Sequence, residues 1–137
     1  MTRTAEVTMR WVRQLQFEGR GKAGARPQIL VDGDTEVATS PVELLLLAAG
    51  TCTASDVVII LEKQRVKLQS LEIDIVGTRR EEQPRRVTAM ALHVRVRGEG
   101  ADEGKVRRAI DLSIEKYCSV IASLAPDIPI TYDVTIA

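Results

Sequence analysis

The sequence predicts an α+β fold in which the strands form antiparallel sheet. Several short segments alternate apolar and polar residues, as half-buried strands do, and two longer segments carry apolar residues at helical spacing. The order is strand–strand–strand–helix–strand–strand–helix–strand, with hairpin-length connections between neighbouring strands, which favours antiparallel sheet. At 137 residues the chain has the length of one ordinary domain, so we expect a single domain over 1–137.

The amino-terminal part is predicted to contain three strands. Residues 5–13 alternate, and the period of two continues through Phe17. Residues 18–27 carry three glycines and a proline, which predicts a loop, and residues 29–31 form a short third strand. The basic side chains of the predicted loop are Arg20, Lys22 and Arg26.

The segment from Ser40 to about Arg65 is predicted to be a long helix. Ser40 can cap the amide of Glu43, Pro41 suits the first turn, and Glu43 completes a capping box. Apolar residues surround nearly the whole circumference, which indicates a helix at the centre of a structure. One chain of this size has little sheet with which to cover such a helix, so we expect a partner subunit to supply the missing cover.

The carboxy-terminal half is predicted to hold two strands, a helix and a last strand. Residues 71–75 and 90–96 alternate and are joined by the polar stretch 79–86. A helix opens at Asp102 and ends before Pro126, and residues 130–136 form a strand with one apolar face. The stripe of this helix comprises Val106, Ile110, Ser113, Ile114, Tyr117, Cys118 and Ile121, among which Tyr117 is expected in the core.

The charge and the apolar segments exclude several kinds of partner. Nineteen basic residues balance nineteen acidic ones, which removes the electrostatic reason to expect nucleic acid or an anionic membrane. The longest apolar stretch, Leu44–Gly50, is too short to span a bilayer, and the start of the chain has no apolar run of signal-peptide length. We therefore expect a cytoplasmic protein that acts on a small molecule.

The sequence offers little support for a metal or a nucleotide. A zinc site needs three or four ligands, and the single histidine, His93, falls on the polar face of a strand, where we interpret it as surface. The glycine-rich phosphate motifs and the G-x-S-x-G motif are absent from the sequence. We expect no cofactor and no metal.

The two cysteines, Cys52 and Cys118, are either small apolar core residues or a redox-active pair, since a structural disulfide is rare in a reducing cytosol. Cys52 lies about twelve residues into its helix, beyond the reach of the helix dipole. Lowering a thiol pKa from about 8.5 to about 6.5 requires roughly 2.7 kcal/mol of preferential stabilisation of the thiolate. A guanidinium such as that of Arg20 or Arg26 could supply it.

Two motifs around these cysteines resemble a known family. The run Ser40–Val58 reads SPVELLLLAAGTCTASDVV and resembles the first central helix of OsmC/Ohr proteins, with its reactive cysteine. The run Glu115–Val120 reads EKYCSV and looks like the site of their second cysteine. The resemblance extends from Val7 to Ile136 and includes the order of the strands.

The resemblance implies an intertwined homodimer with antiparallel sheets wrapped around two long central helices. It implies that the Cys52 thiolate attacks an organic hydroperoxide and becomes a sulfenic acid, with which Cys118 condenses into a disulfide. A dithiol reductant, such as a dihydrolipoyl protein, would restore both thiols. Arg20 matches the family arginine that stabilises the thiolate.

Two positions depart from the active peroxidases of this family. Val42 stands where they carry a glutamate that holds the arginine, and the acid here is Glu43, one residue and about 100° further around the helix. Asp56 lies one turn beyond Cys52, where its charge would oppose a thiolate. Three hypotheses therefore stand: a hydroperoxide reductase, a dimer that binds an apolar small molecule without turnover, and a structural protein with inert thiols.

Overall fold

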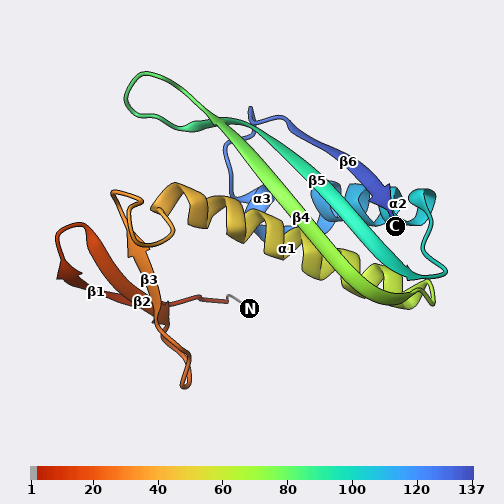
Figure 1. Ribbon diagram of the computed structural model, residues 1–137, viewed down its shortest axis with the longest axis horizontal. Coiled ribbons are helices and arrows are strands. Elements are labelled where there is room, and N and C mark those ends of the chain that lie inside the picture. Colours follow the sequence, from red (N-terminus) through yellow and green to blue (C-terminus); the bar gives the residue numbers. More distant parts are fainter. Residues whose placement is uncertain (1–2) are drawn as a thin grey trace. The chain divides into compact units, whose positions relative to one another are not determined.

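The computed structural model describes residues 3–137, which form two compact units. The first unit ends at Leu45 and the second runs Leu46–Ala137. Each unit has a three-stranded sheet of its own, and the two are described in turn (Figure 1).

The first unit is an antiparallel sheet in the order β1–β2–β3, formed by β1 (Val7–Arg13), β2 (Gln16–Gly21) and β3 (Ile29–Asp32). The predicted loop starts too early, because β2 continues to Gly21. Gly19 pairs with Met9 of β1 and with Ile29 of β3, so this glycine is part of the sheet. Gly21 gives room to another chain segment, since the Arg26 guanidinium lies where a Cβ atom at position 21 would be.

The helix α1 (Pro41–Lys63) confirms the predicted long helix and its start. The Ser40 amide donates to Glu43 Oε1 over 2.9 Å, and the Glu43 amide donates to Ser40 Oγ over 3.1 Å. This reciprocal pair is the expected capping box. In the preceding turn the buried Asp32 carboxylate accepts the amides of Asp34, Glu36 and Val37, which lowers the pKa of Asp32.

By length and composition α1 could cross a membrane, contrary to the expectation drawn from Leu44–Gly50 alone. Its most apolar window of 18 residues has a mean hydropathy of 2.1, and 28% of that window is buried. The same composition is typical of core helices, and Gly50 of α1 contacts Ile75 of the sheet so closely that a Cβ atom would collide with it. The close approach indicates a helix that packs on protein.

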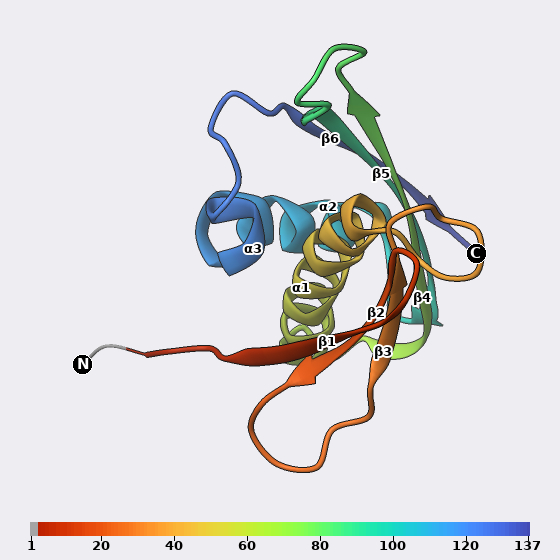
Figure 2. The ribbon, with the colours of Figure 1, turned by 90° about the vertical axis from the view of Figure 1, so that its left-hand side faces the viewer.

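The second unit has a mixed sheet in the order β4–β5–β6, formed by β4 (Lys67–Arg79), β5 (Val87–Glu99) and β6 (Ile130–Ile136). β4 and β5 are antiparallel as predicted, but β6 runs parallel to β5. The antiparallel prediction is wrong for β6 because a helical segment crosses over between these strands, and such a crossover returns the chain in the same direction. α1 and the crossover helix α2 lie on one face of this sheet (Figures 1 and 2).

The predicted second long helix is divided into three pieces. The α2 helix (Glu103–Leu112) begins at the N-cap Asp102, as expected, and a five-residue π turn, η1 (Ser113–Tyr117), follows it directly. Cys118 then has extended backbone (φ −73°, ψ 104°), and α3 (Ser119–Ala122) is a single short turn. The expectation of two long central helices is therefore met only by α1.

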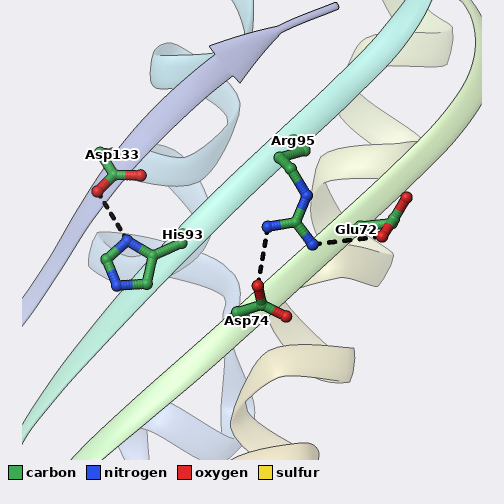
Figure 3. A network of polar contacts seen from close by, with 5 residues as sticks. All are labelled: Glu72, Asp74, His93, Arg95 and Asp133. Atoms are coloured by element: carbon green, nitrogen blue, oxygen red, sulfur yellow. Dashed lines mark hydrogen bonds and ion pairs between the residues drawn. The ribbon is translucent and has the colours of Figure 1, made fainter.

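The opposite face of the second sheet carries charged side chains (Figure 3). Arg95 donates to Asp74 over 2.8 Å and to Glu72 over 3.2 Å, and His93 Nδ1 lies 2.7 Å from Asp133. These pairs are cross-strand and diagonal neighbours on the exposed face of the sheet, where such pairs stabilise a sheet modestly. The expectation that His93 is ordinary strand surface is confirmed.

At Gly98 of β5 the backbone of β4 leaves no room for a side chain. A Cβ atom at Gly98 would lie 2.6 Å from the backbone oxygen of Lys67, beside an irregularity in the pairing of the two strands. We expect Gly98→Ala to lower the free energy of unfolding by about 1–3 kcal/mol, because backbone has to shift to admit the methyl group. Urea denaturation measures the change.

Gly104→Ala is the matched control. A Cβ atom there meets only Asp102 Oδ1, at 3.4 Å, and alanine favours the helix over glycine. We expect this control to be neutral or slightly stabilising. Equal losses in the two variants would contradict the steric account of Gly98.

Candidate thiol site

The second unit brings Cys52 and Cys118 together. Cys52 is half-buried in the middle of α1, and Cys118 is 3% exposed in the segment between η1 and α3. Both cysteines are free thiols, and Cys52 lies near enough to Cys118 to raise the pKa of the Cys118 thiol. Two thiols that are 66 positions apart in the chain therefore meet at one site.

The π turn decides how Cys118 reaches Cys52. In a regular α-helix, residue 118 would be turned about 140° from residue 113, since each residue rotates by about 100°. Here the Cys118 amide donates to the Ser113 carbonyl oxygen over 2.7 Å, one residue further back than in an α-helix. The widened turn leaves Ser113 and Cys118 both buried and leaves Tyr117 52% exposed, so the expectation that Tyr117 is core is wrong.

Two donors approach the Cys118 sulfur. The Thr53 hydroxyl donates to Cys118 Sγ over 3.6 Å, and the Ile121 amide donates to it over 3.4 Å. Burial raises the pKa of Cys118, and the neighbouring Cys52 raises it as well, whereas the bonds from Ile121 and Thr53 act in the opposite direction. On balance the pKa of the Cys118 thiol is raised above its ordinary value.

Asp56 is held by a hydroxyl group. Ser113 Oγ donates to Asp56 Oδ2 over 2.8 Å, and Ser113 is completely buried. The sequence predicted that Asp56 lies beside Cys52, and in the structure its hydrogen-bond partner is the first residue of the π turn. This bond ties α1 to the turn that positions Cys118.

The other two predicted site residues belong to the first unit. Arg20 lies in β2, and its guanidinium donates to the carbonyl oxygens of Gly21, Gly24 and Lys22 over 3.0–3.4 Å. Glu43 forms the capping box, so its first interpretation holds. The roles of Arg20 and Glu43 in the chemistry of Cys52 stay predictions.

Sequence reasoning missed Thr53 and Ser113 as members of the site. Thr53 directly follows Cys52, and Ser113 is the one serine or threonine in the apolar stripe of the second helical segment. A fully buried hydroxyl needs a partner, which is the signal that could have indicated both residues. Across residues 3–137, no group of three or more His, Cys, Asp and Glu side chains is arranged to hold a metal ion.

The site is thus a pair of free thiols, braced by hydroxyl groups, between a long helix and a π turn. The family model described as OsmC-like protein matches residues 32–133. This span includes both cysteines and most of the chain, so the protein belongs to the OsmC-like family.

A relative in sequence supports this assignment, and two solved structures share the fold. Protein YhfA of Escherichia coli K12 is 43% identical over 128 residues, which cover 93% of this chain and 94% of that protein. The OsmC-like protein of Mycoplasma pneumoniae has a similar structure, with a TM-score of 0.82, 16% identity and coverage of 100% and 99% of the two chains. The organic hydroperoxide resistance protein OhrB of Bacillus subtilis matches with a TM-score of 0.62, 13% identity and coverage of 96% and 98%.

The bond between Asp56 and Ser113 leads to a prediction about stability. Ser113→Ala removes the donor and leaves the carboxylate without this partner, so we expect the free energy of unfolding to fall by about 1–3 kcal/mol. Ser123→Ala is the control, because the Ser123 hydroxyl donates to a backbone oxygen at an exposed position. We expect the control to change stability by less than about 0.5 kcal/mol in the same urea titration. A Ser113→Ala variant as stable as the control would show that the hydrogen bond between Ser113 and Asp56 does not stabilise the fold.

Proposed function

We propose that the protein is a thiol-dependent peroxidase that reduces organic hydroperoxides. The observation that carries the proposal is the placement of Cys52 beside Cys118, close enough to raise the pKa of the Cys118 thiol, with Thr53, the neighbour of Cys52 in α1, bonded to the Cys118 sulfur. A reactive thiol and a second thiol within its reach are the two parts that disulfide-based peroxide reduction needs. The fold shared with an organic hydroperoxide resistance protein supports this choice of substrate.

The different surroundings of the two thiols support separate roles. Cys52 is half-buried and so is the more accessible to a substrate, whereas Cys118 is buried and its pKa is raised. The raised pKa of Cys118 leaves less of its sulfur in the thiolate form that attacks a peroxide, and its burial restricts access to it. Cys52 is therefore the attacking thiolate.

The reaction has three steps. The Cys52 thiolate attacks the distal oxygen of the hydroperoxide, the O–O bond breaks, and the alcohol leaves with a proton while Cys52 becomes a sulfenic acid. Cys118 then attacks the Cys52 sulfur, a disulfide forms and water leaves. A dithiol reductant, such as a dihydrolipoyl protein, exchanges with the disulfide and restores both thiols.

Arg20 and Glu43 complete the proposed site by the family resemblance. Arg20 would provide the positive charge that favours the Cys52 thiolate, with Glu43 or another acid to orient it. A cytoplasmic location agrees with two cysteines that are both unpaired, since reducing compartments keep thiols free.

The proposal predicts distinct behaviour for the two cysteine variants. Cys52→Ser abolishes consumption of cumene hydroperoxide, and Cys118→Ser consumes about one equivalent per chain and keeps its sulfenic acid, because no second thiol is present to condense with it. Stopped-flow kinetics follow the peroxide, and mass spectrometry after dimedone labelling follows the sulfenic acid. Since the chain has only two cysteines, each variant keeps a single thiol, Cys118 in Cys52→Ser and Cys52 in Cys118→Ser. Undiminished turnover in Cys52→Ser would reject the mechanism.

We also propose that the protein is a homodimer. Many large apolar side chains are exposed on both units of the single chain. Monomeric soluble proteins rarely expose large apolar patches, and such patches mark interaction surfaces. They include Val7, Met9, Trp11, Ile29 and Val37 of the first unit and Ile59 and Val76 of the second. A second copy that covers them accounts for the helix whose apolar residues extend around its circumference.

The dimer has a direct test in solution. Sedimentation equilibrium is expected to give twice the 15.1 kDa mass of the chain. Ile59→Lys, which buries a charge in the proposed interface, should weaken association at least about tenfold. Gln69→Lys adds the same charge at an exposed position of β4 and should leave the dimer intact. A monomeric wild-type protein would overturn the proposal.

A second candidate function is binding of an apolar small molecule without turnover. The observation in its favour is an apolar hollow of about 540 Å³ in the first unit. Its apolar lining includes Val7, Met9, Phe17, Ile29, Val31 and Leu44. A co-purified apolar ligand in native mass spectrometry, together with absent peroxide turnover, would favour this candidate over the peroxidase.

The third hypothesis is a structural protein with inert thiols. It predicts that Cys52 resists alkylation at neutral pH.

A further inference from the structure

Thr53 behaves differently from the other hydroxyl residues of α1. Thr51 donates to the Leu47 carbonyl oxygen over 2.8 Å, and Ser55 donates to the Thr51 carbonyl oxygen over 2.8 Å, which is how such residues satisfy themselves within a helix. Thr53 instead donates to the sulfur of Cys118, 65 positions away in the chain. It does so with no exposed surface, so water is not an alternative partner.

Thr53 therefore contacts Cys118, and its chain neighbour Cys52 lies near enough to influence the ionisation of the same thiol. Cys52 contributes the thiol that would be oxidised, and Thr53 contributes a hydroxyl donor at 3.6 Å from Cys118 Sγ. The Ile121 amide supplies a further donor at 3.4 Å. The Cys118 sulfur is held by groups that donate hydrogen bonds, an arrangement that favours a negative charge on it.

The proposed disulfide step requires that charge. Cys118 reacts as a thiolate, but its burial raises its pKa and so makes the thiolate scarce at neutral pH. When Cys52 is a sulfenic acid, the Cys118 thiolate forms the S–S bond, and the departing hydroxide takes up a proton and leaves as water. A hydrogen bond donated to the Cys118 sulfur stabilises the thiolate, which is the form of this residue that reacts.

We propose that Thr53 is a positioning residue for Cys118: its hydroxyl holds the sulfur beside Cys52 and stabilises its thiolate during disulfide formation. The inference rests on the proposed peroxidase function, because it concerns the second step of that reaction. It assigns to Thr53 a role distinct from those of the two cysteines.

The chain offers closely matched variants. Thr53→Val keeps the shape of the side chain and removes the donor, and Thr53→Ser restores the donor. Thr51→Val makes the same chemical change two residues away, where the hydroxyl contacts only backbone oxygens of its own helix. A general effect of threonine loss from α1 would appear in both valine variants.

The first experiment separates the two chemical steps. Fully reduced protein is mixed with one equivalent of cumene hydroperoxide, and the rates of peroxide loss and of sulfenic acid decay are measured over a range of pH. Thr53→Val should slow sulfenic acid decay about fivefold to tenfold relative to peroxide loss, the size expected for one hydrogen bond. Its rate profile should shift to higher pH, because more hydroxide is needed to form the same fraction of thiolate.

Thr53→Ser should return the decay rate and its pH profile toward those of the wild type, and Thr51→Val should match the wild type in both. The inference is overturned if Thr53→Val decays as fast as the wild type, or if the two valine variants slow equally without a shift of the pH profile.

A second experiment does not depend on peroxide chemistry. In a Cys52→Ser background, Cys118 is the only thiol, and its ionisation is followed by the ultraviolet absorbance of the thiolate. Adding Thr53→Val should raise the pKa of Cys118, and adding Thr51→Val should leave it unchanged. A wild-type protein that consumes no peroxide would refute the proposed function, whereas an unchanged Cys118 pKa in the Thr53→Val variant would refute the role of Thr53.

Discussion

The proximity of the Cys52 and Cys118 thiols is the constraint on which the rest of the site depends. It requires a helix that carries one sulfur into the interior and a second segment that delivers the other sulfur to the same place. The π turn provides that delivery, because its wider hydrogen-bond ring redirects the chain just before Cys118. Such turns within helices occur frequently at functional sites.

Polar side chains make this arrangement specific within an apolar setting. Asp56 and Thr53 of α1 each bond to the second helical segment, one to Ser113 and the other to Cys118. Hydrophobic packing alone would tolerate small shifts of one helix past another, whereas buried hydrogen bonds have to be satisfied in one arrangement. The Asp56 carboxylate, which lies beside the thiols, therefore has Ser113 as its hydrogen-bond partner.

Family membership and the thiol pair bear on function at different levels. The match over residues 32–133 and the 43% identity to Protein YhfA assign the chain to the OsmC-like family, and the fold extends to distant hydroperoxide resistance proteins. Chemistry depends on the residues around the sulfurs. In this chain the environment distinguishes a more accessible thiol from a buried one, which is the asymmetry that a two-thiol reaction uses.

The sequence by itself determined the order of the elements, the capping box of Ser40 and Glu43, the start of α2 at Asp102, and Cys52 and Cys118 as the residues of interest. These features depend on local periodicity and on hydrogen bonds between residues close in the chain, which a single sequence displays. Only the tertiary structure decided the parallel direction of β6, the continuation of β2 through Gly19, the π turn before Cys118, and the bonds that Thr53 and Ser113 make. Each of these depends on a partner distant in the chain or on a change of helical geometry, and neither leaves a periodic pattern in the residues that take part.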